Sequence, residues 1–311
     1  MSTNVGPTSH GSLADPKGAG THHVTRAGKW VAGARPRTLP AAVVPVVVGT
    51  AVAFAGGPVI WWRSVCALIV ALAIQIGTNY ANDYSDGVRG TDAERVGPVR
   101  LVAGGLAPPR NVKAASFFAF GVAGVVGLVL ALYTSPFLLV VGAACFAAGW
   151  FYSGGSRPYG YAGYGEVFVF VFFGLVAVVG TEYVNLGHIT ALAVVAALPV
   201  GLLATALLVV NNLRDIESDS RAGKKTLAVR VGPKGTRGFY AALVITSFVL
   251  VAVIALWRPA ALVALLAIGA GVGPVRRVLG GAQGKELVVA LAATGMLQLV
   301  FGALLALGIA L

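Results

Sequence analysis

The chain has 311 residues, of which 57% are hydrophobic and only 11% are charged, and its mean hydropathy is +0.84. Soluble domains carry about 25% charged residues, so this composition excludes a soluble globular protein and predicts an all-α integral membrane protein. The formal net charge is +12, and most of the basic residues lie outside the apolar segments. We expect no nucleic-acid partner.

Residues 1–28 form a segment rich in Gly, Ser, Thr and His, without the apolar core of a signal peptide. We expect this segment to be disordered and cytoplasmic. Its histidines, His10, His22 and His23, are not expected to bind a metal. Residues 29–311 are expected to form one polytopic transmembrane domain.

Nine apolar segments follow, and a helix needs roughly 17 to 25 residues to cross a bilayer. They are 38–56, 64–84, 112–133, 136–153, 164–185, 188–212, 237–257, 259–275 and 287–311. The connections alternate between short and long, so nine transmembrane helices would place all the long connections on one side, together with the N-terminus.

The basic residues predict which side this is. Of the 23 lysines and arginines, 21 fall in the N-terminal segment or the long connections, and only Arg63 and Arg258 fall in short ones. Basic loops stay cytoplasmic, so the protein is expected in the cell membrane with its long loops and N-terminus in the cytoplasm. Topology and contact with anionic lipid explain this charge, which could also attract an anionic substrate.

A polar cluster, NYANDYSDGVRGTD (79–92), follows the second apolar segment. Asn79, Asn82, Asp83 and Asp86 are spaced i, i+3, i+4 and i+7, so they share one face of a helix. A polar face of this kind is costly in lipid, and we expect it to point into the bundle.

A second cluster, NNLRDIESD (211–219), follows the sixth segment. Asn212, Asp215 and Asp219 again share a helical face. The recurrence predicts two similar four-helix halves with a ninth helix added, and it predicts that the two polar faces oppose each other across the bundle.

Carboxylates gathered at one site repel one another and raise each other's pKa, unless a cation offsets their charge. Mg²⁺ binds carboxylate and amide oxygens and commonly completes its coordination with substrate phosphates. The two clusters therefore predict a Mg²⁺ site shared with a phosphate or diphosphate. Simple solvated loop ends are the alternative interpretation.

Basic residues beside both clusters could bind diphosphate oxygens. They are Arg89, Arg95, Arg100, Arg157, Lys224, Lys225 and Arg230. A diphosphate held in this way is a good leaving group, and aromatic faces would stabilise the allylic cation that it leaves behind. The aromatic candidates are Tyr80, Tyr84, Phe151, Tyr152, Tyr159, Tyr161, Tyr164 and Phe168. Taken singly, each basic residue is also explained by the positive-inside rule, and each aromatic residue by the interfacial aromatic belt.

The two clusters resemble the two aspartate-rich motifs of the UbiA-type intramembrane aromatic prenyltransferase superfamily, and the likeness covers nearly the whole chain from about Trp30. Four further stretches are similar to its 1,4-dihydroxy-2-naphthoate polyprenyltransferase (MenA) branch: ARPRTLPAAVVPVVVGT (34–50), GPVRLVAGGL (97–106), GYGEVFVFVFFG (163–174) and GKELVVALAATGMLQLVFG (284–302). The wider superfamily often has its third acid where this chain has Gly90, and the later Asp92 is typical of the naphthoate branch.

The resemblance implies a helical bundle around a central cavity that opens sideways to lipid. It implies transfer of a polyprenyl group from a long polyprenyl diphosphate to the ring carbon of 1,4-dihydroxy-2-naphthoate that bears the carboxylate, with loss of CO₂, giving demethylmenaquinone. The implied Mg²⁺ ligands are Asp83, Asp86, Asp215 and Asp219, with Asp92 as a further ligand. Asn79, Asn82 and Asn212 would help to bind metal or phosphate, and Arg157 with Lys224 or Lys225 would contact the diphosphate.

The acceptor is also anionic, so a cation should meet its carboxylate. We place Arg35 and Arg37 there, although both could instead anchor the first span by snorkelling. Tyr152 is expected to contact substrate. Glu166 lies just inside the fifth span, so it is either paired with a cation such as Arg157 or engaged in acceptor binding, and a role as a base stays open.

Other function classes have less support. A divalent-cation transporter should carry acids toward the far face, where Glu182 is the only one. A CDP-alcohol phosphotransferase needs one compact DGxxAR…GxxxDxxxD motif, which the sequence lacks. Within the superfamily, hydroxybenzoate, homogentisate and a glycerol phosphate are alternative acceptors. The donor's chain length and the oligomeric state are not predicted.

Overall fold

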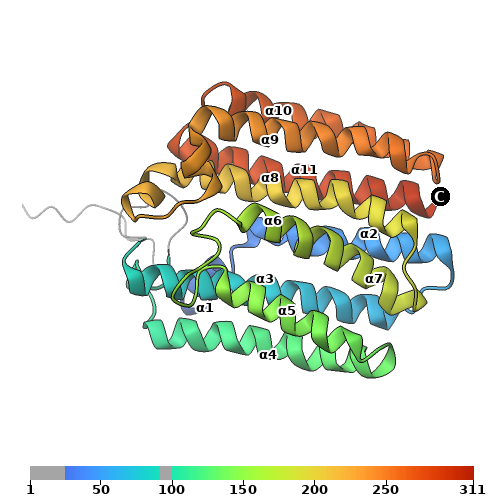
Figure 1. Ribbon diagram of the computed structural model, residues 1–311, viewed down its shortest axis with the longest axis horizontal. Helices are drawn as coiled ribbons and strands as arrows, with labels where there is room; N and C mark the ends of the chain where they lie inside the picture. The colour runs from blue at the N-terminus through green and yellow to red at the C-terminus, as the bar shows by residue number, and fades with distance from the viewer. Residues whose placement is uncertain (1–24, 92–99) are drawn as a thin grey trace, which may run out of the picture.

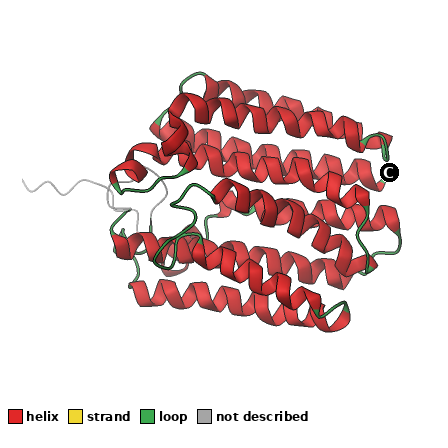
Figure 2. Ribbon diagram, in the orientation of Figure 1, coloured by secondary structure: helices red, strands yellow, loops and turns green. Residues whose placement is uncertain are grey.

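The computed structural model of the protein describes residues 25–91 and 100–311. Within these ranges every regular element is a helix and no strand occurs (Figure 2). The elements in chain order are α1 (Arg26–Gly33), η1 (Pro36–Thr38), α2 (Pro40–Gly56), α3 (Trp61–Arg89), α4 (Pro109–Tyr133), α5 (Phe137–Phe151), α6 (Gly165–Phe170), η2 (Val171–Val176), α7 (Ala177–Leu186), α8 (Ala191–Arg221), α9 (Leu227–Ile254), η3 (Pro259–Ala267), α10 (Ile268–Leu279) and α11 (Gly284–Ala310).

All nine predicted apolar segments are helical. Among the described residues, seven helices are long and apolar enough to cross a bilayer, and an eighth span results if Ala27–Thr38 and Pro40–Gly56, which meet at 55°, are counted as one. The remaining segment, α5, has 15 residues and is short for a span. Length and composition therefore support seven or eight crossings.

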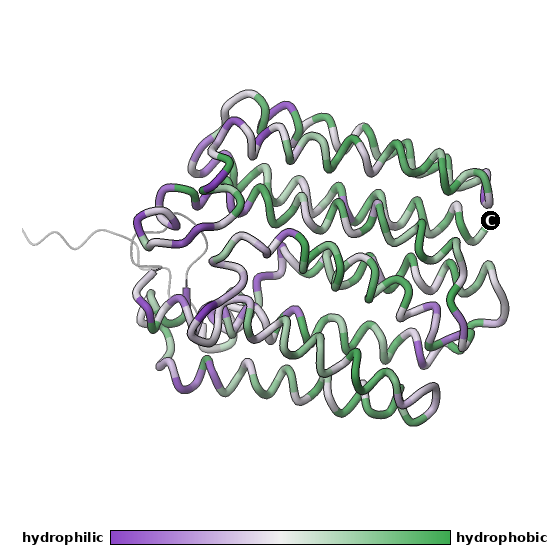
Figure 3. Tube along the Cα trace, in the orientation of Figure 1, coloured by the Kyte–Doolittle hydropathy of each residue, from purple (hydrophilic) through white to green (hydrophobic). Residues whose placement is uncertain are grey.

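The helices lie side by side in one elongated bundle (Figure 1). Helices α3, α4 and α5 pack together on one side, and α8, α9, α10 and α11 pack together on the other. Helices α2 and α7 lie between the two groups and pack against each other. Hydrophilic residues gather at the end of the bundle where α3 and α8 finish, as Figure 3 shows.

Helices α3 and α8 extend past their predicted ends at residues 84 and 212, because left-handed glycines stop them later. Gly90 has φ of 72° directly after α3, and Gly223 has φ of 73° just beyond α8. Glycine adopts this conformation without strain and commonly ends helices. Each aspartate-rich motif is therefore helical through Asp86 or Asp219.

The fifth predicted span is one continuous helix in which α6 and α7 are joined by the π-helical segment η2. Such segments are rare and often mark functional sites. Gly174 lets η2 approach α8 closely, since a Cβ placed on it would lie 2.6 Å from the Cα of Gly201. This contact fixes one wall of the bundle interior.

The predicted disordered segment falls mainly on residues 1–24, which with His10, His22 and His23 lie outside the described residues. The described chain starts at Thr25, whose hydroxyl caps α1 by accepting from the backbone N–H of Gly28 at 3.0 Å. The last three residues of the predicted segment therefore belong to a helix.

Candidate active site

A cavity of about 1110 Å³ lies inside the bundle. Its apolar wall includes residues from α4, α5, η2 and α7. Its polar wall includes members of both aspartate-rich motifs: Asn79, Asn82, Asp83, Asp86, Asn211, Asn212, Asp215 and Asp219. A cavity that is mostly apolar with converging polar groups suits a ligand with a charged head and an apolar tail.

Lys224 joins the two motifs inside this cavity. Its Nζ lies 3.3 Å from Asp86 Oδ1 and 3.3 Å from Asp219 Oδ1, and all three side chains are nearly buried. Left-handed Gly223 turns the chain back over the end of α8, where the backbone N–H of Lys224 donates to the carbonyl of Asp219 at 2.9 Å. A single ammonium group therefore bridges the polar face of α3 and the polar face of α8.

Asp86 of the first motif has several polar partners. Its carboxylate accepts a hydrogen bond from the hydroxyl of Tyr161 and a second from Thr91 Oγ1 at 3.3 Å. An Arg100 nitrogen lies 3.8 Å from Asp86 Oδ2. Burial raises the pKa of the Tyr161 phenol and the charge of Asp86 adds to this, so the phenol stays protonated and donates.

Asp83 anchors a loop. Its Oδ2 accepts from the backbone N–H of Leu101 and its Oδ1 from that of Val102, both at 2.9 Å. The side chain is buried, at 1% exposure, so these two bonds hold the turn after residue 100 firmly against α3. This turn carries Arg100 to Asp86. The predicted metal ligand thus has an anchoring role as well.

Arg214 is a site residue that sequence reasoning passed over. Its Nε and Nη2 each donate to one carboxylate oxygen of Asp215 at 2.8 Å, and Nη2 also donates to Asn211 Oδ1 at 2.9 Å. The guanidinium lines the cavity, and its Nη1 is buried without a hydrogen-bond partner among the described residues. An arginine within an aspartate-rich helix was the signal available in the sequence.

The three predicted asparagines each have a partner within the protein. Asn82 Oδ1 accepts from Ser153 Oγ at 2.6 Å, and Asn212 Nδ2 donates to Glu166 Oε1 at 3.0 Å. Asn79 bonds to the turn that precedes α2. Glu166 is thus engaged by an amide. Pairing with a cation such as Arg157, one of the two alternatives for Glu166, does not form among the described residues.

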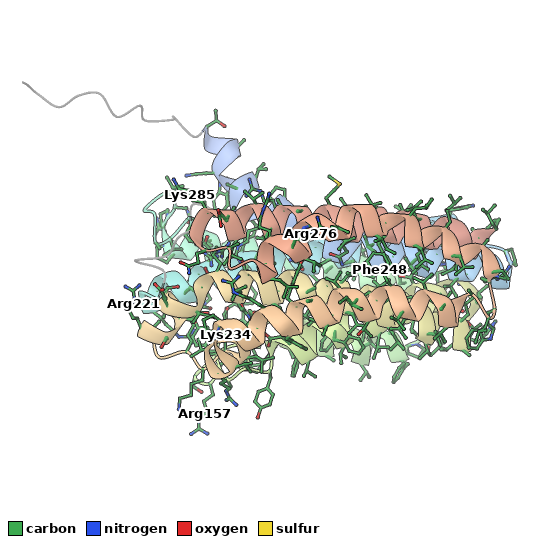
Figure 4. All side chains as sticks on the ribbon, turned by 90° about the horizontal axis from the view of Figure 1, so that it is seen from above. Arg157, Arg221, Lys234, Phe248, Arg276 and Lys285 are labelled. Carbon is green, nitrogen blue, oxygen red and sulfur yellow. The ribbon has the colours of Figure 1, made fainter. Side chains whose placement is uncertain are left out.

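Several other predicted residues lie away from the cavity. Arg157 is exposed and points out of the bundle (Figure 4). Lys225 is exposed as well. Neither of them, nor Glu166, belongs to the cavity wall, whereas Arg35, Arg37 and Tyr152 do. Asp92 lies outside the described residues.

Four aromatic rings form a row along the cavity wall. Tyr152 meets Tyr159 edge to face at 5.6 Å between ring centroids, and Tyr159 stacks on Phe168 at 3.9 Å. Phe168 and Phe172 follow at 6.0 Å, the latter within η2. Of the predicted aromatic residues, Tyr152, Tyr159, Tyr161 and Phe168 line the cavity, and Tyr80, Tyr84, Phe151 and Tyr164 do not.

Glu182, the acid near the far end, has a structural role. Its carboxylate is fully buried and accepts from the backbone N–H of Thr190 at 3.0 Å and from its hydroxyl at 2.5 Å. These bonds tie α7 to the start of α8. A carboxylate committed to this connection gives no support to an ion path through the bundle.

The donor set at the polar end suits a hard cation. In the described ranges, no three His, Cys, Asp or Glu side chains are gathered closely enough to hold one ion. Asp86 and Asp219 instead face each other around the Lys224 ammonium, with Asp215 on the same helix. Carboxylate and amide oxygens shared with a phosphate ligand are the usual surroundings of Mg²⁺.

Comparison with known proteins identifies the family. The model of the UbiA prenyltransferase family matches residues 42–289. The chain belongs to the UbiA prenyltransferase family. A 1,4-dihydroxy-2-naphthoate octaprenyltransferase of Mycobacterium tuberculosis is 49% identical to it over 273 residues, which are 88% of this chain and 94% of that protein.

Solved UbiA homologs share the fold. The one from Aeropyrum pernix K1 has a TM-score of 0.67 at 14% identity and covers 87% of this chain and 97% of its own. A UbiA homolog from Archaeoglobus fulgidus bound to GPP and Mg²⁺ has a TM-score of 0.59 at 15% identity, covering 91% and 99%. The resemblance inferred from the two motifs is confirmed.

Proposed function

We propose that this UbiA-family protein transfers a polyprenyl group from a polyprenyl diphosphate to 1,4-dihydroxy-2-naphthoate in menaquinone biosynthesis. The observation that carries the proposal is the joining of Asp86 and Asp219 through Lys224 at the polar end of a large, mostly apolar cavity. The 49% identity to a dihydroxynaphthoate octaprenyltransferase favours a naphthoate acceptor over hydroxybenzoate, homogentisate or a glycerol phosphate.

The proposed reaction breaks the bond between the prenyl carbon and the diphosphate oxygen, and the electron pair leaves with the diphosphate. The ring carbon that bears the carboxylate forms the new carbon–carbon bond. Loss of CO₂ then returns an electron pair to the ring. The direct product is therefore the quinol form of demethylmenaquinone.

The residues at the polar end have complementary roles in this proposal. Asp86, Asp215 and Asp219 would hold Mg²⁺, which when bound would neutralise charge on the leaving diphosphate. Lys224 and Arg214 would bind diphosphate oxygens, since charge that develops there is stabilised by fixed cations in a water-poor site. The ammonium of Lys224 already lies between the two motifs.

The aromatic row would protect the allylic cation. The rings of Tyr159 and Phe168 are stacked and line the cavity, so they would exclude water and offer negative π density. Arg35 and Arg37 would meet the acceptor carboxylate from another part of the cavity wall.

The membrane placement is part of the same proposal. We count the bent first span and the short α5 as one crossing each, which makes nine crossings. The polar end and the N-terminus would then lie in the cytoplasm, and the cavity would open sideways to lipid for a long prenyl tail. The start of α1 and the end of α11 lie at opposite ends of the bundle (Figure 1), which supports an odd number of crossings. The concentration of lysine and arginine in the long loops supports the orientation.

A panel of acceptors tests the proposal. Membranes containing the protein are incubated with a polyprenyl diphosphate, Mg²⁺ and each aromatic acceptor in turn, and the products are separated by mass. We expect dihydroxynaphthoate to be prenylated with loss of CO₂. Prenylation of hydroxybenzoate without prenylation of dihydroxynaphthoate would contradict the acceptor assignment.

A further inference from the structure

The turn between α1 and α2 carries a strained arginine. Arg35 has φ of 53°, and it is the one non-glycine residue with positive φ in the described part of the chain. In this conformation the Cβ atom of any residue other than glycine lies too close to the backbone. Strain of this kind persists only where surrounding contacts hold the backbone, and it gathers at functional sites.

Three polar side chains hold this turn. Thr38 Oγ1 donates to the carbonyl of Arg35 at 2.9 Å. It also accepts from Gln75 Nε2 at 3.0 Å and from Asn79 Nδ2 at 3.1 Å. Asn79 Nδ2 bonds in addition to the carbonyl of Ala34 at 2.9 Å. The carbonyl of Ala34 is thus held directly by Asn79. The carbonyl of Arg35 is held by Thr38, whose hydroxyl is fixed in turn by Gln75 and Asn79 from one face of α3.

The guanidinium held in this way has a spare donor. Arg35, Thr38, Gln75 and Asn79 all line the cavity. Nη2 of Arg35 is buried and has no hydrogen-bond partner among the described residues. A buried donor without a partner is costly, and arginine binds carboxylates through two parallel N–H···O bonds. A carboxylate inside the cavity would satisfy this donor.

We infer that Thr38, Gln75 and Asn79 form a positioning clamp that holds Arg35 toward the carboxylate of the aromatic acceptor. The inference rests on the proposed function, which supplies that carboxylate. It assigns Asn79 to the acceptor side, acting through Arg35, although the motif suggested a metal or phosphate ligand. Helix α3 would then serve both substrates, with Asn79 on the acceptor side and Asp86 on the diphosphate side.

The clamp should act on binding more than on turnover. The acceptor carboxylate is present in the ground state and is lost after transfer, so its pairing with Arg35 should appear in the acceptor KM and Kd. Loss of a hydrogen bond to a charged group weakens binding roughly 10- to 100-fold.

Arg35→Gly tests the contact itself. Glycine accepts the left-handed backbone, so this variant should fold while losing the guanidinium. We expect its Kd for dihydroxynaphthoate, measured by equilibrium titration of the full-length protein in detergent without donor, to rise roughly 10- to 100-fold. The Kd for polyprenyl diphosphate should stay at the wild-type value. An unchanged acceptor Kd would overturn the inference.

Variants at Thr38 and Asn79 test the clamp. Thr38→Val keeps the side-chain shape without the hydroxyl, and Asn79→Ala removes the amide, so both should raise the acceptor KM. Thr38→Ser keeps the hydroxyl and should therefore keep the wild-type acceptor KM. Ser64→Ala is the matched contrast on α3, because Ser64 bonds to Thr50 and Asn185 and does not line the cavity, so this variant should leave the acceptor KM unchanged. A changed donor KM with an unchanged acceptor KM in Asn79→Ala would overturn the assignment.

A ligand without the carboxylate separates recognition from packing. The Ki of 1,4-dihydroxynaphthalene as a competitive inhibitor should be the same in wild-type protein, Arg35→Gly and Asn79→Ala. If these variants lose as much affinity for this inhibitor as for dihydroxynaphthoate, recognition of the carboxylate does not explain their effect and the inference is overturned. If wild-type protein prenylates dihydroxynaphthoate and Arg35→Gly keeps the wild-type KM, the clamp is wrong and the proposed function stands. If wild-type protein neither binds nor prenylates dihydroxynaphthoate, both are wrong.

Discussion

Asp86 on α3 and Asp219 on α8 share the ammonium group of Lys224, whose Nζ lies 3.3 Å from an oxygen of each. Two buried carboxylates at this separation repel each other unless a cation lies between them. The lysine therefore stabilises the polar end of the bundle, and a bound metal ion would compete with it for the same acids.

Replacing Lys224 should expose this repulsion. Removal of one partner from a buried ion pair costs about 3 to 5 kcal/mol, so Lys224→Ala should lower the unfolding free energy by an amount in this range without metal. Added Mg²⁺ should recover part of the loss. Thermal unfolding in detergent with and without Mg²⁺ measures both effects. Lys234→Ala, at an exposed position of α9, is the control, and an equal loss there would contradict the account (Figure 4).

Asp83 and Asp86 should respond differently to the same change. Asp83→Asn weakens the bonds to the backbone amides of Leu101 and Val102, so it should lower stability by about 1 to 3 kcal/mol. Asp86→Asn should mainly abolish prenyl transfer. Chemical denaturation and initial rates for both variants give the comparison. Identical stability and identical activity in the two variants would show that their roles do not differ.

The aromatic row should contribute to turnover. Phe168→Leu keeps an apolar side chain but removes the ring that stacks on Tyr159, and a desolvated cation–π contact is worth about 2 kcal/mol. We therefore expect kcat to fall by roughly 30-fold. Phe248→Leu removes a ring that packs on Phe301 away from the cavity, and its kcat should stay close to wild type. Equal kcat values for the two variants would remove the row from the mechanism.

Metal removal should stop the reaction reversibly. The acids Asp86, Asp215 and Asp219 supply only oxygen donors, which suits Mg²⁺. EDTA should abolish prenyl transfer, and excess Mg²⁺ should restore it. Turnover that continues in EDTA after the protein has been dialysed against the chelator would argue against a metal-assisted departure of the diphosphate.

The sequence predicted the all-helical membrane fold and the polar face of each motif because both depend on local periodicity. Apolar runs located the nine helical segments, and spacing placed Asn79, Asn82 and Asp86 on one face of α3. The bent first span and the short α5 could not be predicted, because tertiary packing decides where such helices turn. The late ends of α3 and α8 were set by Gly90 and Gly223, which are ordinary glycines in a chain with 42 of them.

Side-chain partners across the bundle were harder to predict than positions along a helix. The family resemblance implied diphosphate contacts for Arg157 and for Lys224 or Lys225. Arg157 and Lys225 are exposed, whereas Lys224 is buried after Gly223. Glu166 bonds to Asn212 from another helix, a contact that spacing along one helix does not reveal. Arg214 was hidden inside the second motif.

The release of labelled CO₂ tests the central claim most directly. Purified protein is given carboxyl-labelled 1,4-dihydroxy-2-naphthoate, a polyprenyl diphosphate and Mg²⁺, and CO₂ and prenylated product are counted together. We predict one CO₂ for each prenylated ring in the wild-type protein and neither product in Asp86→Asn or Asp219→Asn. Equal turnover in these variants, or prenylation that keeps the carboxylate, would contradict it.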